Sequence, residues 1–113
     1  MNEIFPQGVI ANGLIFLSGM PGLDPLSGQV VSSSFEEQAR QAFANIRTVL
    51  EDAGSSMDKV IKTTIFMVAG NDFGIVNQVY ADFFPTESPA RSVPQVLPFP
   101  GGILISVECI ALM

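Results

Sequence analysis

The sequence predicts an α+β fold, formed by one domain over residues 1–113, in which a mixed sheet carries two helices on one face. Two segments repeat apolar residues at helical spacing, and shorter β-branched or apolar runs lie before, between and after them. The resulting order is β-β-β-α-β-α-β-β. Because strand-helix-strand crossovers are right-handed, both helices are expected on the same side of the sheet.

The chain is expected to open as a β-hairpin. Apolar runs at 9–11 and 14–17 flank Asn12-Gly13, a preferred pair for a tight turn between antiparallel strands. A turn-rich stretch follows and leads to another brief run, so a third strand is expected at 29–31 to extend the sheet.

Two amphipathic helices are expected next. Ser34, with Glu37 three residues later, forms a capping box, and apolar residues then recur at helical spacing up to Gly54. Asp72 can cap a second helix, which a Phe-Pro pair closes.

The remaining strands are expected at 59–68, 90–97 and 103–112. The first is β-branched and predicts a buried central strand, and a turn rich in Pro and Gly separates the other two. Both faces of the last strand are mostly apolar, yet the helices can cover only one. Charged residues make up 14% of the chain, against roughly 25% on average. We therefore expect copies of the chain to cover the helix-free face.

Composition excludes several classes of chemistry. The chain has no His and one Cys, which excludes Ser-His-Asp, Cys-His and His-zinc sites and an internal disulfide. Its net charge of -6 argues against nucleic-acid binding. No apolar run approaches the roughly 18 residues of a membrane span, and no targeting signal is visible, so we expect a cytoplasmic protein that binds neither metal nor membrane.

Arg91 is the first candidate for chemistry. It is the only basic residue after Lys62, and a guanidinium can hold the carboxylate of a small organic acid with two parallel hydrogen bonds. A surface or interface ion pair is the alternative.

Glu108 is the second candidate. It is the only acid after Glu87 and lies on an apolar strand, where a carboxylate serves either as a proton carrier or as one half of an ion pair with Arg91. The ion pair is the interpretation that the sequence favours.

Three further positions carry weaker signals. Ser18 and Gly19 end a predicted strand, where a hydroxyl and backbone N–H groups could bind a substrate oxygen. Asn77 could cap a backbone group or order a site. Cys109 is expected to be a buried, inert thiol.

A series of motifs extends from about Gly8 to the C-terminus. It comprises Gly13–Gly19, Asp24–Gly28, Gln38, Asn45-Ile46, Val49-Leu50, Ala53-Gly54, Lys62–Phe66, Asp72-Phe73, Asn77, Tyr80, Phe83-Phe84, Pro89–Ser92, Leu97-Pro98, Val107-Glu108 and Ile110-Ala111. In this order and spacing the chain resembles the RidA/YjgF family of reactive intermediate deaminases, also labelled endoribonuclease L-PSP.

The resemblance implies a chorismate-mutase-like fold and a homotrimer with three ligand clefts between subunits. It implies hydrolysis of reactive enamines and imines, such as 2-aminoacrylate and 2-iminopropionate, to 2-keto acids and ammonia, without cofactor or metal. Arg91 matches the arginine that binds the substrate carboxylate, and Glu108 matches the glutamate that positions or activates water. Ser18 and Gly19 match the segment that lines the cleft, whereas Asn77 and Tyr80 match positions expected to be structural.

The chain departs from the family pattern around the expected cleft. Phe5 stands where the family has a substrate-ordering tyrosine, and it cannot donate a hydrogen bond. Met20 replaces a common Gln, and Val93 replaces a common Cys but still offers its backbone carbonyl to a substrate. Pro94 predicts a bulge or an edge in its strand, because it lacks an N–H.

Two other functions remain open. A non-catalytic trimeric module could use Arg91 to bind a small carboxylate without turnover. Endoribonuclease activity is the third possibility, and the net charge of -6 and the lack of His oppose it.

Overall fold

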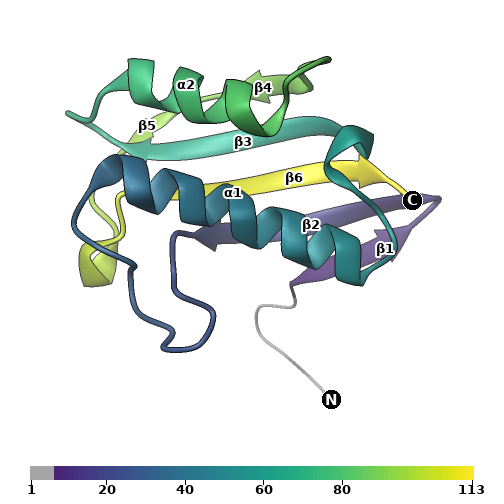
Figure 1. Cartoon of the computed structure of the whole chain (residues 1–113), viewed down its shortest axis with the longest axis horizontal. Coiled ribbons are helices and arrows are strands. Elements are labelled where there is room, and N and C mark those ends of the chain that lie inside the picture. The colour runs from purple at the N-terminus through teal and green to yellow at the C-terminus, as the bar shows by residue number, and fades with distance from the viewer. Residues whose placement is uncertain (1–6) are drawn as a thin grey trace.

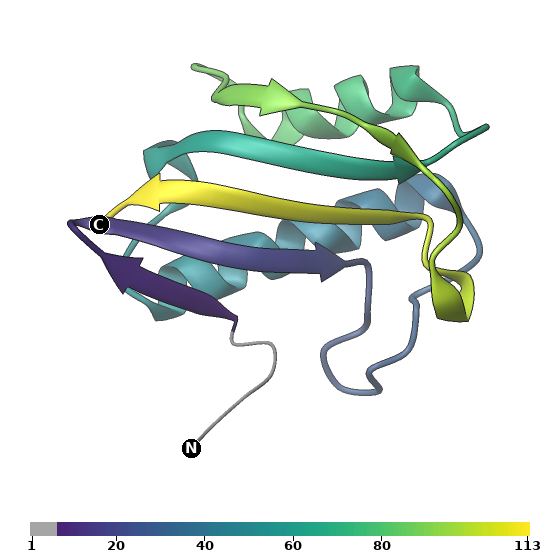
Figure 2. The same ribbon diagram turned by 180° about the vertical axis from the view of Figure 1, so that it is seen from behind.

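The computed structural model, which describes residues 7–113, is a mixed sheet with two helices packed on one face (Figure 1). The strand order is β1-β2-β6-β3-β4, and a short β5 also pairs with β3. Seen from behind, the opposite face of the sheet carries no helix (Figure 2). The predicted α+β class and the placement of both helices on one face are confirmed.

The N-terminal hairpin is confirmed. Strands β1 (Gly8–Ala11) and β2 (Leu14–Pro21) are antiparallel and are joined by Asn12 and Gly13. Both turn residues have positive φ, 54° and 74°, as a tight turn of this hand requires.

The centre of the sheet is the pair β3 (Val60–Val68) and β6 (Ile105–Leu112). Strand β6 runs antiparallel to both β2 and β3, so β2 and β3 are parallel to each other. Two crossovers, β2-α1-β3 and β3-α2-β4, therefore step across the sheet in the same direction. Their common hand places both helices on one face.

Helix α1 (Phe35–Asp52) begins where the capping box predicts, because the Ser34 side chain accepts a hydrogen bond from the Glu37 N–H. Helix α2 (Phe73–Phe83) begins after Asp72, whose side chain accepts from the Gly74 N–H at 2.7 Å. A short 3₁₀ turn, η1 (Met57–Lys59), precedes β3 and was not expected.

The third strand expected at 29–31 is wrong. This segment makes only an isolated bridge, between Val30 and Leu23, and adds nothing to the main sheet. Its backbone bonds within the loop instead, since the Gln29 carbonyl accepts from the Asp24 N–H at 2.8 Å and the Val31 N–H donates to the Gly22 carbonyl at 3.1 Å. The Asp24 carboxylate also accepts from the N–H groups of Leu26 and Ser27.

The strand expected at 90–97 divides into β4 (Ala90–Ser92) and β5 (Gln95–Val96), both parallel to β3 at the edge of the sheet. Pro94 lies between them and cannot donate to the ladder, although its carbonyl accepts from the Met67 N–H at 3.1 Å. The predicted irregularity at Pro94 is confirmed. A short 3₁₀ turn, η2 (Pro100–Gly102), then leads toward β6.

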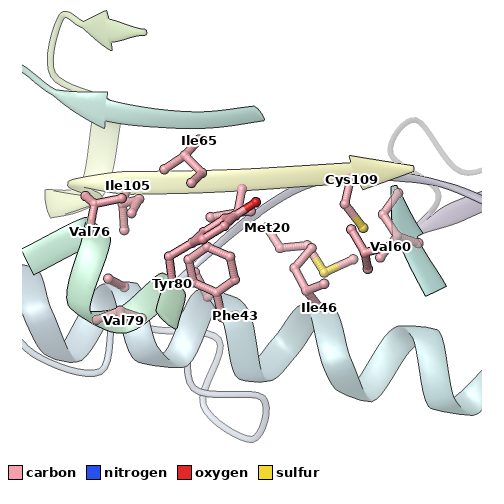
Figure 3. Packing of buried hydrophobic residues seen from close by; sticks show 14 of the residues in the cluster. Met20, Phe43, Ile46, Val60, Ile65, Val76, Val79, Tyr80, Ile105 and Cys109 are labelled. Atoms are coloured by element: carbon pink, nitrogen blue, oxygen red, sulfur yellow. The ribbon is translucent and has the colours of Figure 1, made fainter. Parts of the chain in front are cut away.

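The core fills the space between the helices and the covered face of the sheet (Figure 3). Strand β6 contributes alternate residues to it, namely Ile105, Val107, Cys109 and Ala111, all almost completely buried. Met20, a departure from the family pattern, also packs in this core and is 8% exposed. Among the described residues no helix is long and apolar enough to cross a membrane.

Gln38 is the fully buried polar side chain that ties α1 to the start of β6. Its amide donates to the carbonyls of Ser32 at 2.9 Å and Gly102 at 3.0 Å, and its oxygen accepts from the Leu104 N–H at 2.9 Å. Every hydrogen-bonding group of the side chain is engaged by backbone, so it joins segments far apart in sequence.

We predict that Gln38→Leu destabilises the fold by about 3 kcal/mol, because buried backbone groups lose their partners. Denaturant unfolding at fixed protein concentration measures this loss. Gln41→Leu is the matched control on the same helix, since the Gln41 amide donates to the Asn45 side chain and the residue is only half-buried. Equal losses in the two variants would contradict the role assigned to Gln38.

We further predict that Cys109 resists thiol reagents in the native protein. Burial, helped by the neighbouring Glu108 charge, raises the pKa of the Cys109 thiol to about 12, so the reactive thiolate is scarce at pH 8. Modification with iodoacetamide should require denaturant. Stoichiometric labelling of native protein within minutes would show that the thiol is accessible.

Candidate active site

Arg91 lies on β4 with its side chain on the helix-covered side of the sheet, against α2. Its Nη2 donates to Oδ1 of Asn77 at 2.6 Å. Its guanidinium carbon lies 4.8 Å from the ring centre of Tyr80 and 5.7 Å from that of Phe73. These distances are within the range of attraction between a cation and an aromatic face. Arg91 is thus held by a neutral acceptor and two rings.

The Tyr80 hydroxyl fixes the backbone two residues before Arg91, at Pro89. It lies 3.0 Å from Oγ1 of Thr63 and donates to the Pro89 carbonyl at 3.4 Å. Burial raises the pKa of the Tyr80 phenol, while the bond with Thr63 and the charge of Arg91 act in the opposite direction. The phenol therefore remains protonated and able to donate throughout the neutral range.

Arg91 also lines a cavity of about 280 Å³ together with Asn77, Tyr80, Phe84 and Pro89. A cavity of this size accommodates a small organic acid. Apart from the bond to Asn77, the guanidinium has further N–H groups, and these can receive a carboxylate in the two-bond geometry.

Glu108 lies on the opposite, helix-free face. Its neighbours in β6, Val107 and Cys109, point into the core, so Glu108 points away from the helices and is half-buried. Thr64 is its partner on β3. An ion pair of Arg91 with Glu108 inside one chain is therefore wrong, since the two side chains lie on different faces of the sheet. Among residues 7–113 the ion pairs are those of Arg40 with Glu36 and Asp82.

Ser18 and Gly19 lie directly across the ladder from Glu108. Leu17 pairs with Cys109 and Met20 pairs with Val107, so two residues of β2 oppose one of β6 and form a β-bulge.

The bulge packs closely at Gly19. A Cβ on Gly19 would come within 2.8 Å of the Ser106 Oγ. The structure therefore brings the predicted Ser18-Gly19 segment together with Glu108.

The bulge borders a second cavity, of about 360 Å³, between β2, α1 and the loop that follows β2. Ser18, Gly19, Leu23 and Asn45 are among the residues that line it, and none of its lining residues lines the Arg91 cavity. The candidate residues of one chain thus form two separate groups, one around Arg91 and one around Glu108.

The other predicted positions are less involved. Val93 follows β4, and its side chain packs against the core. Phe5 lies outside the described residues. Cys109 is buried as expected. Within the described part of the chain, no three His, Cys, Asp or Glu side chains are placed to hold a metal ion.

Sequence reasoning missed the contribution of α2. From the residues alone Asn77 could cap a backbone group or order a site, and the resemblance implied structural roles for Asn77 and Tyr80. In the structure both contact Arg91, as Phe73 does. The signal was their spacing, because positions i, i+4 and i+7 share one helix face. Nothing in the sequence showed that this face meets Arg91.

Comparison with known proteins finds relatives of this chain. Residues 2–113 match the protein family described as Endoribonuclease L-PSP. The human 2-iminobutanoate/2-iminopropanoate deaminase is 39% identical over 108 residues, covering 96% of this chain and 79% of the relative. The chloroplastic Reactive Intermediate Deaminase A of Arabidopsis thaliana is 44% identical over 107 residues, covering 95% of this chain but only 57% of the plant protein.

Solved structures superpose closely on this chain. RidA from the Antarctic bacterium Psychrobacter sp. PAMC 21119 superposes with a TM-score of 0.92 at 30% identity, covering 98% of this chain and 89% of that one. E. coli TdcF with bound serine gives a TM-score of 0.90 at 31% identity, covering 100% of this chain and 91% of TdcF. The resemblance seen in the sequence is thereby confirmed, and the chain belongs to the RidA/YjgF family, also described as Endoribonuclease L-PSP.

Proposed function

We propose that this protein is a hydrolytic deaminase that converts reactive 2-imino acids and their enamine tautomers, of the 2-aminoacrylate and 2-iminopropionate type, to 2-keto acids and ammonia. The observation that carries the proposal is the fixed guanidinium of Arg91, which borders a cavity suited to a small carboxylate. Relatives at 39–44% identity are named for this reaction. The serine bound to TdcF is itself a small molecule with a carboxylate.

The separation of Arg91 from Glu108 supports a site built between subunits. No movement of side chains alone brings together two residues that project from opposite faces of one sheet. A neighbouring copy docked on the helix-free face can supply the missing half. The site would then join Arg91 of one subunit to Glu108 and the Ser18-Gly19 bulge of the next.

The helix-free face has the character of such an interface. Val9, Phe16 and Leu112 are 54%, 41% and 48% exposed there, and half-buried Phe66 and Ile110 lie on the same face. Exposed apolar side chains on neighbouring strands are stabilised by burial in an oligomer. Three copies arranged around this face form the homotrimer with inter-subunit clefts, in the chorismate-mutase-like arrangement.

The chemistry follows from these positions. Arg91 holds the carboxylate, and the protonated imine presents an electrophilic carbon. Glu108 accepts a proton from water as the water oxygen bonds to that carbon, which gives a tetrahedral carbinolamine. Glu108 returns this proton to the nitrogen, and the carbon–nitrogen bond then breaks as the hydroxyl oxygen forms the carbonyl and gives its own proton to Glu108. Ammonia takes that proton, so the 2-keto acid and ammonium leave. The backbone of Ser18, Gly19 and Val93 lines the cleft, and no metal or cofactor takes part.

The two alternative functions, a binding module and a ribonuclease, would use this chain differently. A non-catalytic module would bind a small carboxylate through Arg91 without turnover. A ribonuclease would need to attract phosphates to a chain of net charge -6 that has no His. The deaminase accounts for both Arg91 and Glu108.

We predict that Arg91→Ala lowers kcat/KM for 2-iminobutanoate by about 100-fold or more, because an ionic two-bond anchor is lost. The imine is generated in situ with an amino-acid oxidase, and its disappearance is followed with semicarbazide as trap. Arg47→Ala is the matched control, since Arg47 also lies over an aromatic ring, 5.1 Å from the centre of Phe83. Light scattering must show equal assembly in both variants. No acceleration by the wild-type protein with any small imino acid would favour the binding module.

We also predict complementation between two inactive variants. Arg91→Ala and Glu108→Gln subunits, unfolded together and refolded as mixed trimers, should recover activity, because about a quarter of the clefts then combine an intact Arg91 with an intact Glu108. Each variant refolded alone is the control. Mixed trimers as inactive as both parents would place the site within one chain.

A further inference from the structure

Helix α2 contacts Arg91 through three residues that take no part in the proposed reaction steps. Phe73, Asn77 and Tyr80 occupy one face of α2 at i, i+4 and i+7, and each contacts the guanidinium of Arg91. We propose that these residues, here termed the α2 clamp, are positioning residues that fix which edge of the guanidinium receives the substrate carboxylate.

Asn77 sets the rotation of the guanidinium. The 2.6 Å bond from Nη2 to the Asn77 Oδ1 engages one N–H and opposes rotation of the group about its bonds. The remaining N–H groups then present a fixed pair of donors. A carboxylate meeting them forms two parallel bonds without an ordering cost at the moment of binding.

Two aromatic rings hold the guanidinium from the side of α2. Tyr80 is 4% exposed and lies beneath the group, while Phe73 is 41% exposed at the first turn of α2. An aromatic face attracts the cation without forming a hydrogen bond that would compete with the substrate. The clamp therefore holds Arg91 and leaves its charge available.

Asn77 carries no charge, and this is the property of the clamp that most affects substrate binding. The exposed Asn77 side chain could be replaced by the carboxylate of Asp with little change in volume. That carboxylate would pair with Arg91 and offset the positive charge that attracts an anionic substrate. We infer that an uncharged acceptor at this position is needed for an anionic substrate.

The first test measures Arg91 itself and does not depend on turnover. In protein labelled with ¹⁵N-arginine, the Nη protons of Arg91 should be resolved and exchange slowly. Asn77→Ala should speed rotation about the Nε–Cζ bond by about tenfold or more, as expected for the loss of a hydrogen bond to a charged group. Arg91→Lys assigns the signals, which separates them from those of Arg40 and Arg47. Fast rotation in the wild type, or equal rates in both proteins, would overturn the clamp.

The second test measures substrate binding and turnover, and here the inference rests on the proposed function. Asn77→Asp should raise KM for 2-iminobutanoate by about 30-fold with kcat within about threefold, because the anchor acts alike on ground and transition states. The dissociation constant of 2-oxobutanoate, measured by calorimetry, should rise equally. Gln78→Glu adds the same charge at the next, exposed position of α2 and should change each value less than twofold.

The outcomes separate the two claims. Slow Arg91 rotation that depends on Asn77, with no imine turnover by the wild type, would sink the deaminase and leave the clamp standing as part of a binding site. Turnover that Asn77→Asp and Gln78→Glu reduce equally would sink the clamp and leave the deaminase.

A matched pair of variants tests the contribution of the rings. Phe73→Leu should shift the Arg91 Nε signal by removing a ring current and should raise KM, while Phe83→Leu removes the corresponding contact with Arg47 and should leave Arg91 unchanged. An Arg91 signal unmoved by Phe73→Leu would exclude that ring from the clamp.

Discussion

Alternate residues of strand β6 face opposite sides of the sheet, and this alternation decides where the core and the candidate site lie. Ile105, Val107 and Cys109 enter the core beneath the helices, and this direction forces Glu108 to the other face. Arg91, paired with buried Thr63 in the neighbouring ladder, lies on the helix side. The same alternation that builds the core thus divides the candidate site into two halves.

Local signals in the sequence were sufficient for the hairpin and the helices. Asn12-Gly13, Ser34 and Asp72 act on residues close to them, and each does in the structure what its chemistry predicts. The expected strand at 29–31 failed because its backbone bonds within the loop, to the backbone of Gly22 and Asp24, an outcome that apolar content does not reveal. Local patterns are therefore reliable where the interactions themselves are local.

The site was harder to predict, because its contacts join distant segments. Arg91 and Glu108 were found as isolated charges in apolar surroundings, but a sequence does not show which faces they occupy. The roles of Asn77 and Tyr80 depend on α2 packing beside β4, which is a tertiary event. Periodicity assigns residues to one face of a helix, and only the assembled sheet shows what that face meets.

The central place of β6 also governs the order in which the fold can be completed. This strand follows all the others in the chain, yet it lies between β2 and β3 and pairs with both. During synthesis the β1-β2 hairpin and the β3-α2-β4 unit emerge first and cannot be joined until Ile105–Leu112 is available. Until then two strand edges stay unpaired, and unpaired edges favour association with other chains. The architecture therefore delays completion of the sheet until β6 is available, and the chain is most exposed to aggregation while these two edges wait for it.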